Sequence, residues 1–211
     1  MEDAVKAVKE ASRIADLIEL RMDYLKNPEM GWLLHNRRKP FIVTNRRREE
    51  GGKYRGNEEE RFKVFKEAIE LGAEYVDIEA GSERSEIQNL MAGTKGTKII
   101  LSLHNFKCTP SIKTLERTFN RMVQQGADLI KIVTFARSWE DNFNIFSLLP
   151  YAKERKRKII AFCMGEKGRM SRIFSPLMGG AWTYASLKPD RASAPGQLFV
   201  EDIKEIWERL R

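Results

Sequence analysis

The stretch GADLIKIVTFA, residues 126–136, is an apolar run of leucine, isoleucine and valine with Lys131 at its centre. Short continuous runs of this kind are typical of strands that are covered on both faces, as in parallel sheets. A buried ammonium group loses its hydration. The stretch therefore predicts a buried parallel strand, and its lysine requires either a buried ion pair or a chemical role.

Similar apolar runs recur along the chain and alternate with amphipathic helical patterns. A strand followed by a helix, repeated, predicts a parallel sheet covered by helices, either an open doubly wound sheet or a (β/α)8 barrel. No G-x-G-x-x-G follows the first run, so the usual dinucleotide argument for an open sheet is absent. The strand-like runs cover residues 15–22, 40–46, 74–80, 97–104, 128–136, 157–165 and 181–187, and the helical patterns cover 57–72, 111–126, 138–155 and 196–211.

Polar residues within the strand-like runs favour the barrel. Alternate side chains of a strand share a face, so Glu19 lies on the same face as Arg21, and Ser102 on that of His104. Such groups would converge at the C-terminal end of a barrel, where (β/α)8 enzymes keep their catalytic residues, whereas an open sheet would scatter many of them. We therefore predict a single (β/α)8 TIM-barrel catalytic domain over residues 1–211.

One strand of that barrel is not accounted for. Seven strand-like runs can be counted, and the chain begins with a helix-like segment. We expect the usual first strand to be lacking, either because the start is trimmed or because the barrel has an open seam.

The composition restricts the possible classes of function. The 211 residues carry a formal net charge of +8, and the basic stretch NRRREEGGKYRG, residues 45–56, could bind nucleic acid or attract a small anionic substrate. Basic and acidic residues are interspersed elsewhere, so we expect no nucleic-acid partner. The sequence shows no membrane-spanning run and no secretory signal, which predicts a cytoplasmic protein with no membrane partner. Cys108 and Cys163 lack the spacing of metal ligands.

Lys131 and His104 are the candidates for chemistry. A poorly solvated lysine has a lowered pKa, and its neutral amine attacks carbonyl groups to form a Schiff base. The alternative is a structural ion pair with a buried carboxylate such as Glu79. His104 ends the strand before that of Lys131 and is suited to proton transfer near neutral pH, whereas His35 is interpreted as a surface residue.

Two further segments offer groups that could bind a ligand. The segment EKGRMSR, residues 166–172, ends in Arg172, whose planar guanidinium group is suited to a carboxylate. The segment RASAPGQ, residues 191–197, is predicted to be a loop, and it could close over a ligand with Ser193 and Gln197.

Six motifs in order resemble those of the type I 3-dehydroquinate dehydratase family of the shikimate pathway. The resemblance covers nearly the whole chain and implies a (β/α)8 barrel, a homodimer, and no metal or external cofactor. It also implies the conversion of 3-dehydroquinate to 3-dehydroshikimate and water in the biosynthesis of chorismate and the aromatic amino acids. The motifs are ELRMDYL (19–25), TNRRREEGG (44–52), LSLHNFKCTP (101–110), GADLIKI (126–132), MGEKGRMSR (164–172) and SAPGQ (193–197).

The resemblance also implies residue roles. Lys131 would form an imine with the C3 carbonyl, while His104 would remove the C2 proton and return a proton to the departing C1 hydroxyl. Glu50 would hold His104 in position, and Arg172 would bind the substrate carboxylate. The other implied site residues are Glu19, Arg21 and Arg46 near the substrate hydroxyls, Ser193 and Gln197 in the closing loop, and Met164 and Tyr184 as apolar wall, with Tyr184 standing where the family would have phenylalanine.

Two other functions remain as alternatives at this point. A class I aldolase of the same barrel type would also use a Schiff-base lysine, but it would need a phosphate cradle near the last strands, of which MGGAW and SAPGQ are poor versions. A basic RNA-binding domain would bind nucleic acid in a salt-sensitive way.

Overall fold

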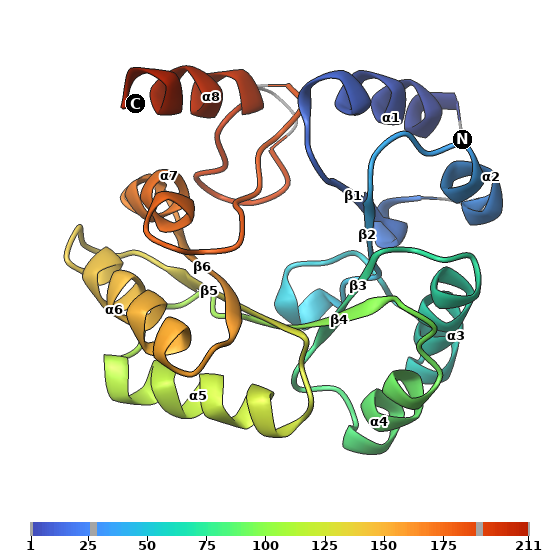
Figure 1. Ribbon diagram of the computed structural model, residues 1–211, viewed down its shortest axis with the longest axis horizontal. Helices are drawn as coiled ribbons and strands as arrows, with labels where there is room; N and C mark the ends of the chain where they lie inside the picture. Colours follow the sequence, from blue (N-terminus) through green and yellow to red (C-terminus); the bar gives the residue numbers. More distant parts are fainter. Residues whose placement is uncertain (1, 26–28, 189–191, 211) are drawn as a thin grey trace. The chain divides into compact units, whose positions relative to one another are not determined.

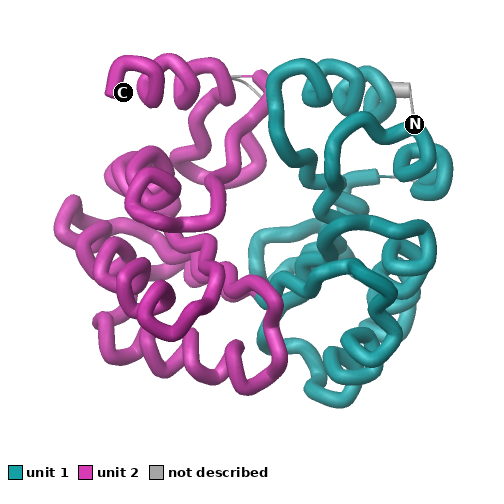
Figure 2. Tube along the Cα trace, viewed as in Figure 1, with its two compact units in different colours: residues 1–101 teal, residues 102–211 magenta. Residues whose placement is uncertain are grey.

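The computed structural model describes residues 2–25, 29–188 and 192–210, which form two compact units. Unit 1 spans residues 1–101 and unit 2 spans residues 102–211 (Figure 2). Arg191 of the predicted loop and Arg211 of the predicted last helix lie outside the described residues. The expectation of one catalytic domain over the whole chain stays a prediction.

The described elements alternate between strand and helix, as the sequence predicts (Figure 1). The six strands follow one another in the sheet in chain order, and β1 with β2, β2 with β3 and β5 with β6 pair in parallel. Unit 1 contains α1 (Glu2–Ile14), β1 (Ile18–Arg21), η1 (Met22–Tyr24), α2 (Met30–His35), β2 (Phe41–Thr44), η2 (Arg48–Glu50), α3 (Glu58–Glu70), β3 (Tyr75–Glu79) and α4 (Arg84–Ala92). Strand β4 (Lys98–His104) runs from unit 1 into unit 2, which adds α5 (Ile112–Gln124), β5 (Leu129–Phe135), α6 (Asp141–Glu154), β6 (Lys158–Met164), α7 (Arg169–Leu177) and α8 (Val200–Arg209).

Helix α3 shows how local sequence sets these elements. The side chain of Asn57 caps the helix by accepting a hydrogen bond from the Glu60 backbone N–H at 2.8 Å. The chain leaves the helix at Gly72, whose φ of +74° is one that glycine adopts without strain. Phe62 and Phe65 are buried beneath the helix, which lies within the predicted range of residues 57–72.

Strand β5 confirms the interpretation of the opening stretch. It pairs in parallel with β6 along its whole length, from Leu129 opposite Lys158 to Phe135 opposite Met164. Six of its seven residues are buried, Lys131 among them. A central strand with both faces covered therefore carries the lysine.

The expected strand over residues 181–187 is wrong. The backbone N–H of Ala181 donates to the Ile159 carbonyl, but only Ser186 forms a bridge, to Phe199. That bridge is isolated because helix α8 begins directly after Phe199, so the segment opposite Ser186 offers no further residue to pair with. The final helix likewise begins at Val200 and not at residue 196, since Gly196 (φ +72°) lies in a turn.

The helices of the chain differ from membrane-spanning helices. Within residues 2–25, 29–188 and 192–210, none is both long and apolar enough to cross a bilayer.

Candidate active site

Lys131 lies in the interior of unit 2. It occupies the third position of β5, and only 4% of its surface is exposed. Its Nζ lies 4.1 Å from the centre of the Tyr184 ring, a cation–π distance. The Tyr184 ring in turn lies 6.2 Å from the ring of Phe162 on the neighbouring strand β6. The amine therefore faces an aromatic wall, and Tyr184 is where the resemblance places an apolar wall residue.

His104 is the last residue of β4, the strand next to β5 in the sheet. Beyond it, the backbone N–H of Asn105 donates to the Val133 carbonyl at 2.8 Å. Val133 follows Lys131 by two positions, so the two share a face of β5. The end of β4 thus lies beside the part of β5 that follows the lysine, and His104 is half-buried there.

Arg172 lies on helix α7 and is 1% exposed. Its guanidinium group stacks at 4.4 Å over the Phe162 ring and makes one hydrogen bond, from Nη2 to the Pro195 carbonyl at 3.3 Å. Among the described residues no carboxylate pairs with it, and its buried Nε has no hydrogen-bond partner. Burial lowers the pKa of Arg172 to about 10, slightly offset by Cys163, so the group still carries its charge at neutral pH.

The predicted closing loop carries Ser193 and Gln197 side by side. Both the backbone N–H and the hydroxyl of Ser193 donate to the Gln197 Oε1, at 2.7 and 3.1 Å. The loop is attached to the end of β6, because the N–H of Gly165 donates to the Pro195 carbonyl at 3.1 Å. Pro195 therefore contacts both that turn and Arg172. Met164, the last residue of β6, is buried directly before the turn.

Unit 1 brings the other four predicted site residues into one charged cluster around Arg46. Arg46 is buried, and its guanidinium group pairs with Asp77 at 2.7 Å and with Glu79 at 3.1 Å. Burial would lower the pKa of Arg46, yet the surrounding carboxylates raise it above its ordinary value. Those carboxylates belong, in order of decreasing effect, to Asp77, Glu79, Glu19 and Glu50.

The same cluster extends along β1. Glu19 accepts a hydrogen bond from the Thr44 hydroxyl at 2.8 Å. Arg21 forms a bidentate ion pair with Asp23, at 2.8 and 2.7 Å. The charge of Glu19 raises the pKa of Arg21, and the charge of Arg46 lowers it. The predicted residues of unit 1 are therefore electrostatic neighbours of one another.

Both carboxylate oxygens of Glu79 accept hydrogen bonds from residues of unit 1. They accept from Arg46, from the backbone N–H of Arg47, and from Arg61. Glu79 was the carboxylate that could have given Lys131 a purely structural ion pair. The structural ion pair of Lys131 with a buried carboxylate such as Glu79 stays a prediction.

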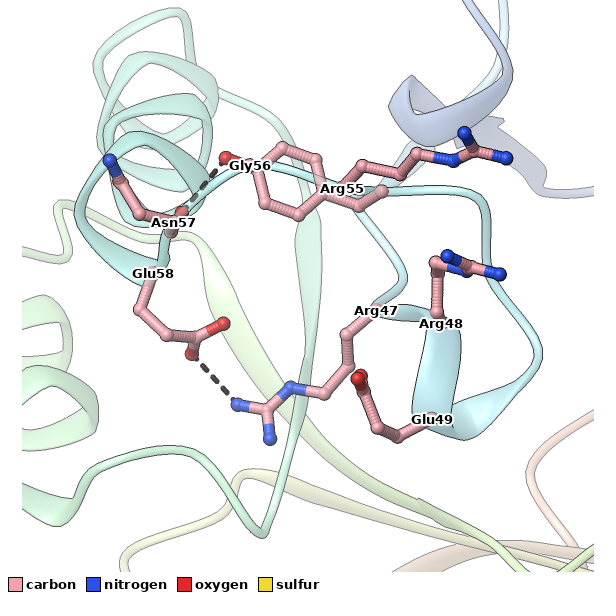
Figure 3. A pocket seen from close by; sticks show the side chains of 8 residues that line it. Arg47, Arg48, Glu49, Arg55, Gly56, Asn57 and Glu58 are labelled. Atoms are coloured by element: carbon pink, nitrogen blue, oxygen red, sulfur yellow. Dashed lines mark hydrogen bonds and ion pairs between the residues drawn. The ribbon is translucent and has the colours of Figure 1, made fainter.

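A pocket of about 680 Å³ opens in unit 1 and is drawn in Figure 3. It is formed by the basic stretch that the composition singled out and by the start of α3. None of the predicted site residues lines it. Its lining residues are Arg47, Arg48, Glu49, Tyr54, Arg55, Gly56, Asn57 and Glu58.

Arg61 is the most prominent charged residue that the sequence interpretation passed over. It lies on α3 and is completely buried between Glu79, Glu58 and Ser82. Its spacing offered a signal, because Arg61 precedes the buried Phe65 by four residues and so lies on the apolar face of the helix.

Comparisons with known proteins identify the family of the chain. The family model of Type I 3-dehydroquinase matches residues 1–210. The 3-dehydroquinate dehydratase of Methanocaldococcus jannaschii is 39% identical over 213 residues, which cover 100% of this chain and 94% of that protein. The enzyme of the same name from Pyrococcus abyssi is 37% identical over 210 residues, with the same coverage.

Solved structures give the same result. The type I 3-dehydroquinate dehydratase of Clostridium difficile superposes with a TM-score of 0.89 at 26% sequence identity, over 99% of this chain and 87% of that one. The enzyme from Aquifex aeolicus follows with a TM-score of 0.81 at 29% identity, over 99% and 94%. This likeness confirms a TIM-barrel-like fold and favours a dehydratase over the aldolase and RNA-binding alternatives. The chain therefore belongs to the type I 3-dehydroquinase family.

Proposed function

We propose that the chain converts 3-dehydroquinate to 3-dehydroshikimate and water through a Schiff base on Lys131. The observation that carries the proposal is the burial of Lys131 in the centre of β5, with its Nζ against the Tyr184 ring. A lysine in this position is shielded from bulk water, as a carbonyl-attacking amine requires. The names of the relatives supply the substrate class.

The proposed reaction proceeds through four steps. The Lys131 amine attacks the C3 carbonyl, and loss of water leaves an imine. The imine acidifies the adjacent C2 hydrogen, so His104 removes that proton as a weak base. The C1–O bond then breaks, and His104 returns its proton to the leaving hydroxyl, which departs as water. Hydrolysis of the conjugated imine releases 3-dehydroshikimate and restores the amine.

Arg172 is proposed to bind the substrate carboxylate. Its buried guanidinium group has one hydrogen bond to a carbonyl and no carboxylate partner among the described residues. A charge that is buried without its counter-ion is costly, and an anionic ligand would offset that cost. Its planar fork also matches a carboxylate better than a lysine would.

The remaining roles are proposed from the family resemblance. Glu50 would orient His104 from the 3-10 turn η2. Ser193 and Gln197, which already bond each other, would close over the ligand, and Met164 and Tyr184 would form apolar wall. Glu19, Arg21 and Arg46 would contact the substrate hydroxyls or one another.

Borohydride trapping tests the Schiff base directly. The protein is incubated with 3-dehydroquinate and sodium borohydride, and its intact mass is then measured. We expect an adduct of the ligand mass less one oxygen atom, or less one further water where elimination precedes reduction. Lys131→Ala should give no adduct, whereas Lys158→Ala, which changes an exposed lysine on β6, should behave as wild type. Trapping that persists in folded Lys131→Ala would refute the assignment.

We also propose that the chain forms a homodimer. The support on this molecule is a set of exposed apolar side chains on or directly beside the contacting helices α6 and α7. Exposed apolar side chains in excess of what a soluble surface needs are typical of interaction surfaces. Sedimentation analysis should find a dimer, and Phe143→Lys should shift it to a monomer that still binds 3-dehydroquinate. The exposed side chains are Trp139, Phe143, Phe174, Leu177 and Met178.

A further inference from the structure

Arg61 is a buried arginine outside the predicted site, and it shares the carboxylate of Glu79 with Arg46. Arg61, on helix α3, has 0% of its side chain exposed, and every nitrogen of its guanidinium group is bonded. Nη1 donates to Glu79 at 2.5 Å and to the Asn45 carbonyl at 3.3 Å. Nη2 donates to the Ser82 hydroxyl at 2.8 Å. The group is therefore fixed by strand, loop and helix at once.

Glu58 holds the outer edge of the same guanidinium group. Its two oxygens accept from Nε and Nη2 of Arg61, each at 2.9 Å. It also accepts from Nη2 of Arg47 at 2.7 Å, and Figure 3 shows Arg47 extended toward Glu58. The Glu58 side chain is 46% exposed, so this carboxylate clamps the buried arginine from the surface.

Glu79 links Arg61 to the predicted site residue Arg46, because its carboxylate pairs with both arginines. One of its oxygens takes Arg61, while the other accepts from Nη1 of Arg46 at 3.1 Å and from the backbone N–H of Arg47 at 3.1 Å. Arg47 is the residue that precedes the 3-10 turn η2, which carries Glu50. Glu79 therefore contacts both the guanidinium group of Arg46, which Asp77 also holds, and the residue at the start of the turn that bears Glu50.

We propose that Arg61, acting through Glu79, is a positioning residue for the reaction: it holds Arg46 in the orientation that binds substrate. The inference rests on the proposed function, in which Arg46 contacts the substrate. The physical basis is charge balance. Arg46 and Arg61 carry the positive charges that face the buried carboxylates of Asp77 and Glu79, while the half-exposed Glu58 pairs with Arg61 from the surface. Without Arg61, Glu79 would carry excess negative charge, draw Arg46 more strongly toward itself, and oppose an anionic ligand.

The effect of removing Arg61 should appear in KM. An interaction that binds substrate and transition state equally changes KM and leaves kcat nearly constant. We therefore expect Arg61→Met to raise KM about tenfold and to change kcat less than about threefold. The control is Lys63→Met, which alters an exposed residue of the same helix that pairs with Glu59 and Glu60. That variant should keep wild-type kinetics.

A double-mutant cycle with Arg46→Lys separates positioning from general support of the fold. Lysine keeps the charge at position 46 but lacks the fork that Glu79 and Asp77 orient. If Arg61 acts through Arg46, Arg61→Met should change KM less than about twofold in the Arg46→Lys background, because contacting residues are non-additive. A KM increase of equal size in both backgrounds would overturn the proposal. Unchanged KM in folded Arg61→Met, with only a lower melting temperature, would also overturn it.

Glu58→Gln provides a test if Arg61→Met does not fold. The substitution weakens the surface clamp on Arg61 and Arg47 at a half-exposed position, so folding is expected to survive. KM should rise about threefold with kcat retained, since a glutamine side chain has no charge and one accepting oxygen, whereas the Glu58 carboxylate accepts three bonds from Arg61 and Arg47. No change in KM would overturn the inference. Loss of turnover and of imine trapping in wild type itself would overturn the proposed function and this inference together, whereas a normal wild type with unaffected variants overturns only the inference.

Discussion

The amine of Lys131 lies against the face of the Tyr184 ring, with 4.1 Å between Nζ and the ring centre. Lysine and tyrosine come from different parts of unit 2, the first from the middle of β5 and the second from the segment after α7. The negative face of an aromatic ring attracts a cation and excludes water. This contact therefore helps to position the proposed nucleophile and limits its access to solvent.

The ring, and not the hydroxyl, should matter for that function. We expect Tyr184→Phe to keep kcat within about twofold, because the ring face that covers Nζ is retained. Tyr184→Leu should slow borohydride trapping about tenfold or more, since a displaced nucleophile loses its near-attack geometry. Trapping rates on folded protein would check this. Equal rates for leucine and phenylalanine would contradict the expectation.

The buried charge of Arg172 should lower the stability of the ligand-free protein while it contributes to substrate binding. Its buried guanidinium group has one hydrogen bond, at 3.3 Å, and no carboxylate partner among the described residues. Arg172→Met should therefore leave the melting temperature of the ligand-free protein unchanged or raise it, as expected when a functional group is buried at a cost. At the same time, kcat/KM should fall by about 100-fold or more through loss of the charge-assisted contact to the substrate.

The matched control for Arg172 is Arg169→Met, which changes an exposed arginine on the same helix. It should alter neither the melting temperature nor kcat/KM. A large drop in melting temperature for Arg172→Met, with activity retained, would show that Arg172 is a structural residue.

Local signals predicted much of this fold. Asn57, the acidic first turn after it and Gly72 define helix α3 in the sequence, and the structure has those ends because capping involves neighbouring residues only. The apolar run around Lys131 also identified β5 correctly. The run at 181–187 failed because a strand depends on its hydrogen-bonding partner, and the partner segment supplies a single bridge before α8 begins.

The site was predicted less completely, for a different reason. Lys131 and His104 could be recognised because a charged or imidazole group interrupts an apolar strand. The role of Arg61 could not be recognised, because its partner Glu79 lies 18 residues away and on another element. Periodicity shows that Arg61 lies on the buried face of α3, but only the fold shows which carboxylate receives it.

The closing loop should depend on Gly196. A Cβ placed there would lie 2.1 Å from the Gly165 carbonyl oxygen, and the residue also has φ +72°. Gly196→Ala should therefore displace Ser193 and Gln197, raise KM, and lower stability by about 1–3 kcal/mol. Gly179→Ala is the control, because its φ is +104° but no atom lies within 4 Å of the added Cβ. A KM increase of the same size in both variants would indicate that backbone strain, and not the clash with Gly165, is responsible.

Asp23 should make the stability of the protein depend on pH. Burial raises the pKa of this carboxyl, but the hydrogen bonds and charge of Arg21 and the backbone N–H of Lys53 outweigh it, so the pKa lies below its ordinary value of 3.8. A carboxyl whose pKa is lower in the folded state contributes stability above its unfolded pKa and loses that contribution as pH falls through the folded value. Asp23→Asn should therefore lower the free energy of unfolding by about 1–3 kcal/mol at pH 7. Urea unfolding at a series of pH values should show that the difference in unfolding free energy between wild type and Asp23→Asn shrinks below pH 3.8. The control is Asp16→Asn, which changes an aspartate without an ion pair to the described residues and should show no such trend. A difference that stays constant into acid would mean that the Asp23 contacts stabilise the protein without their charge.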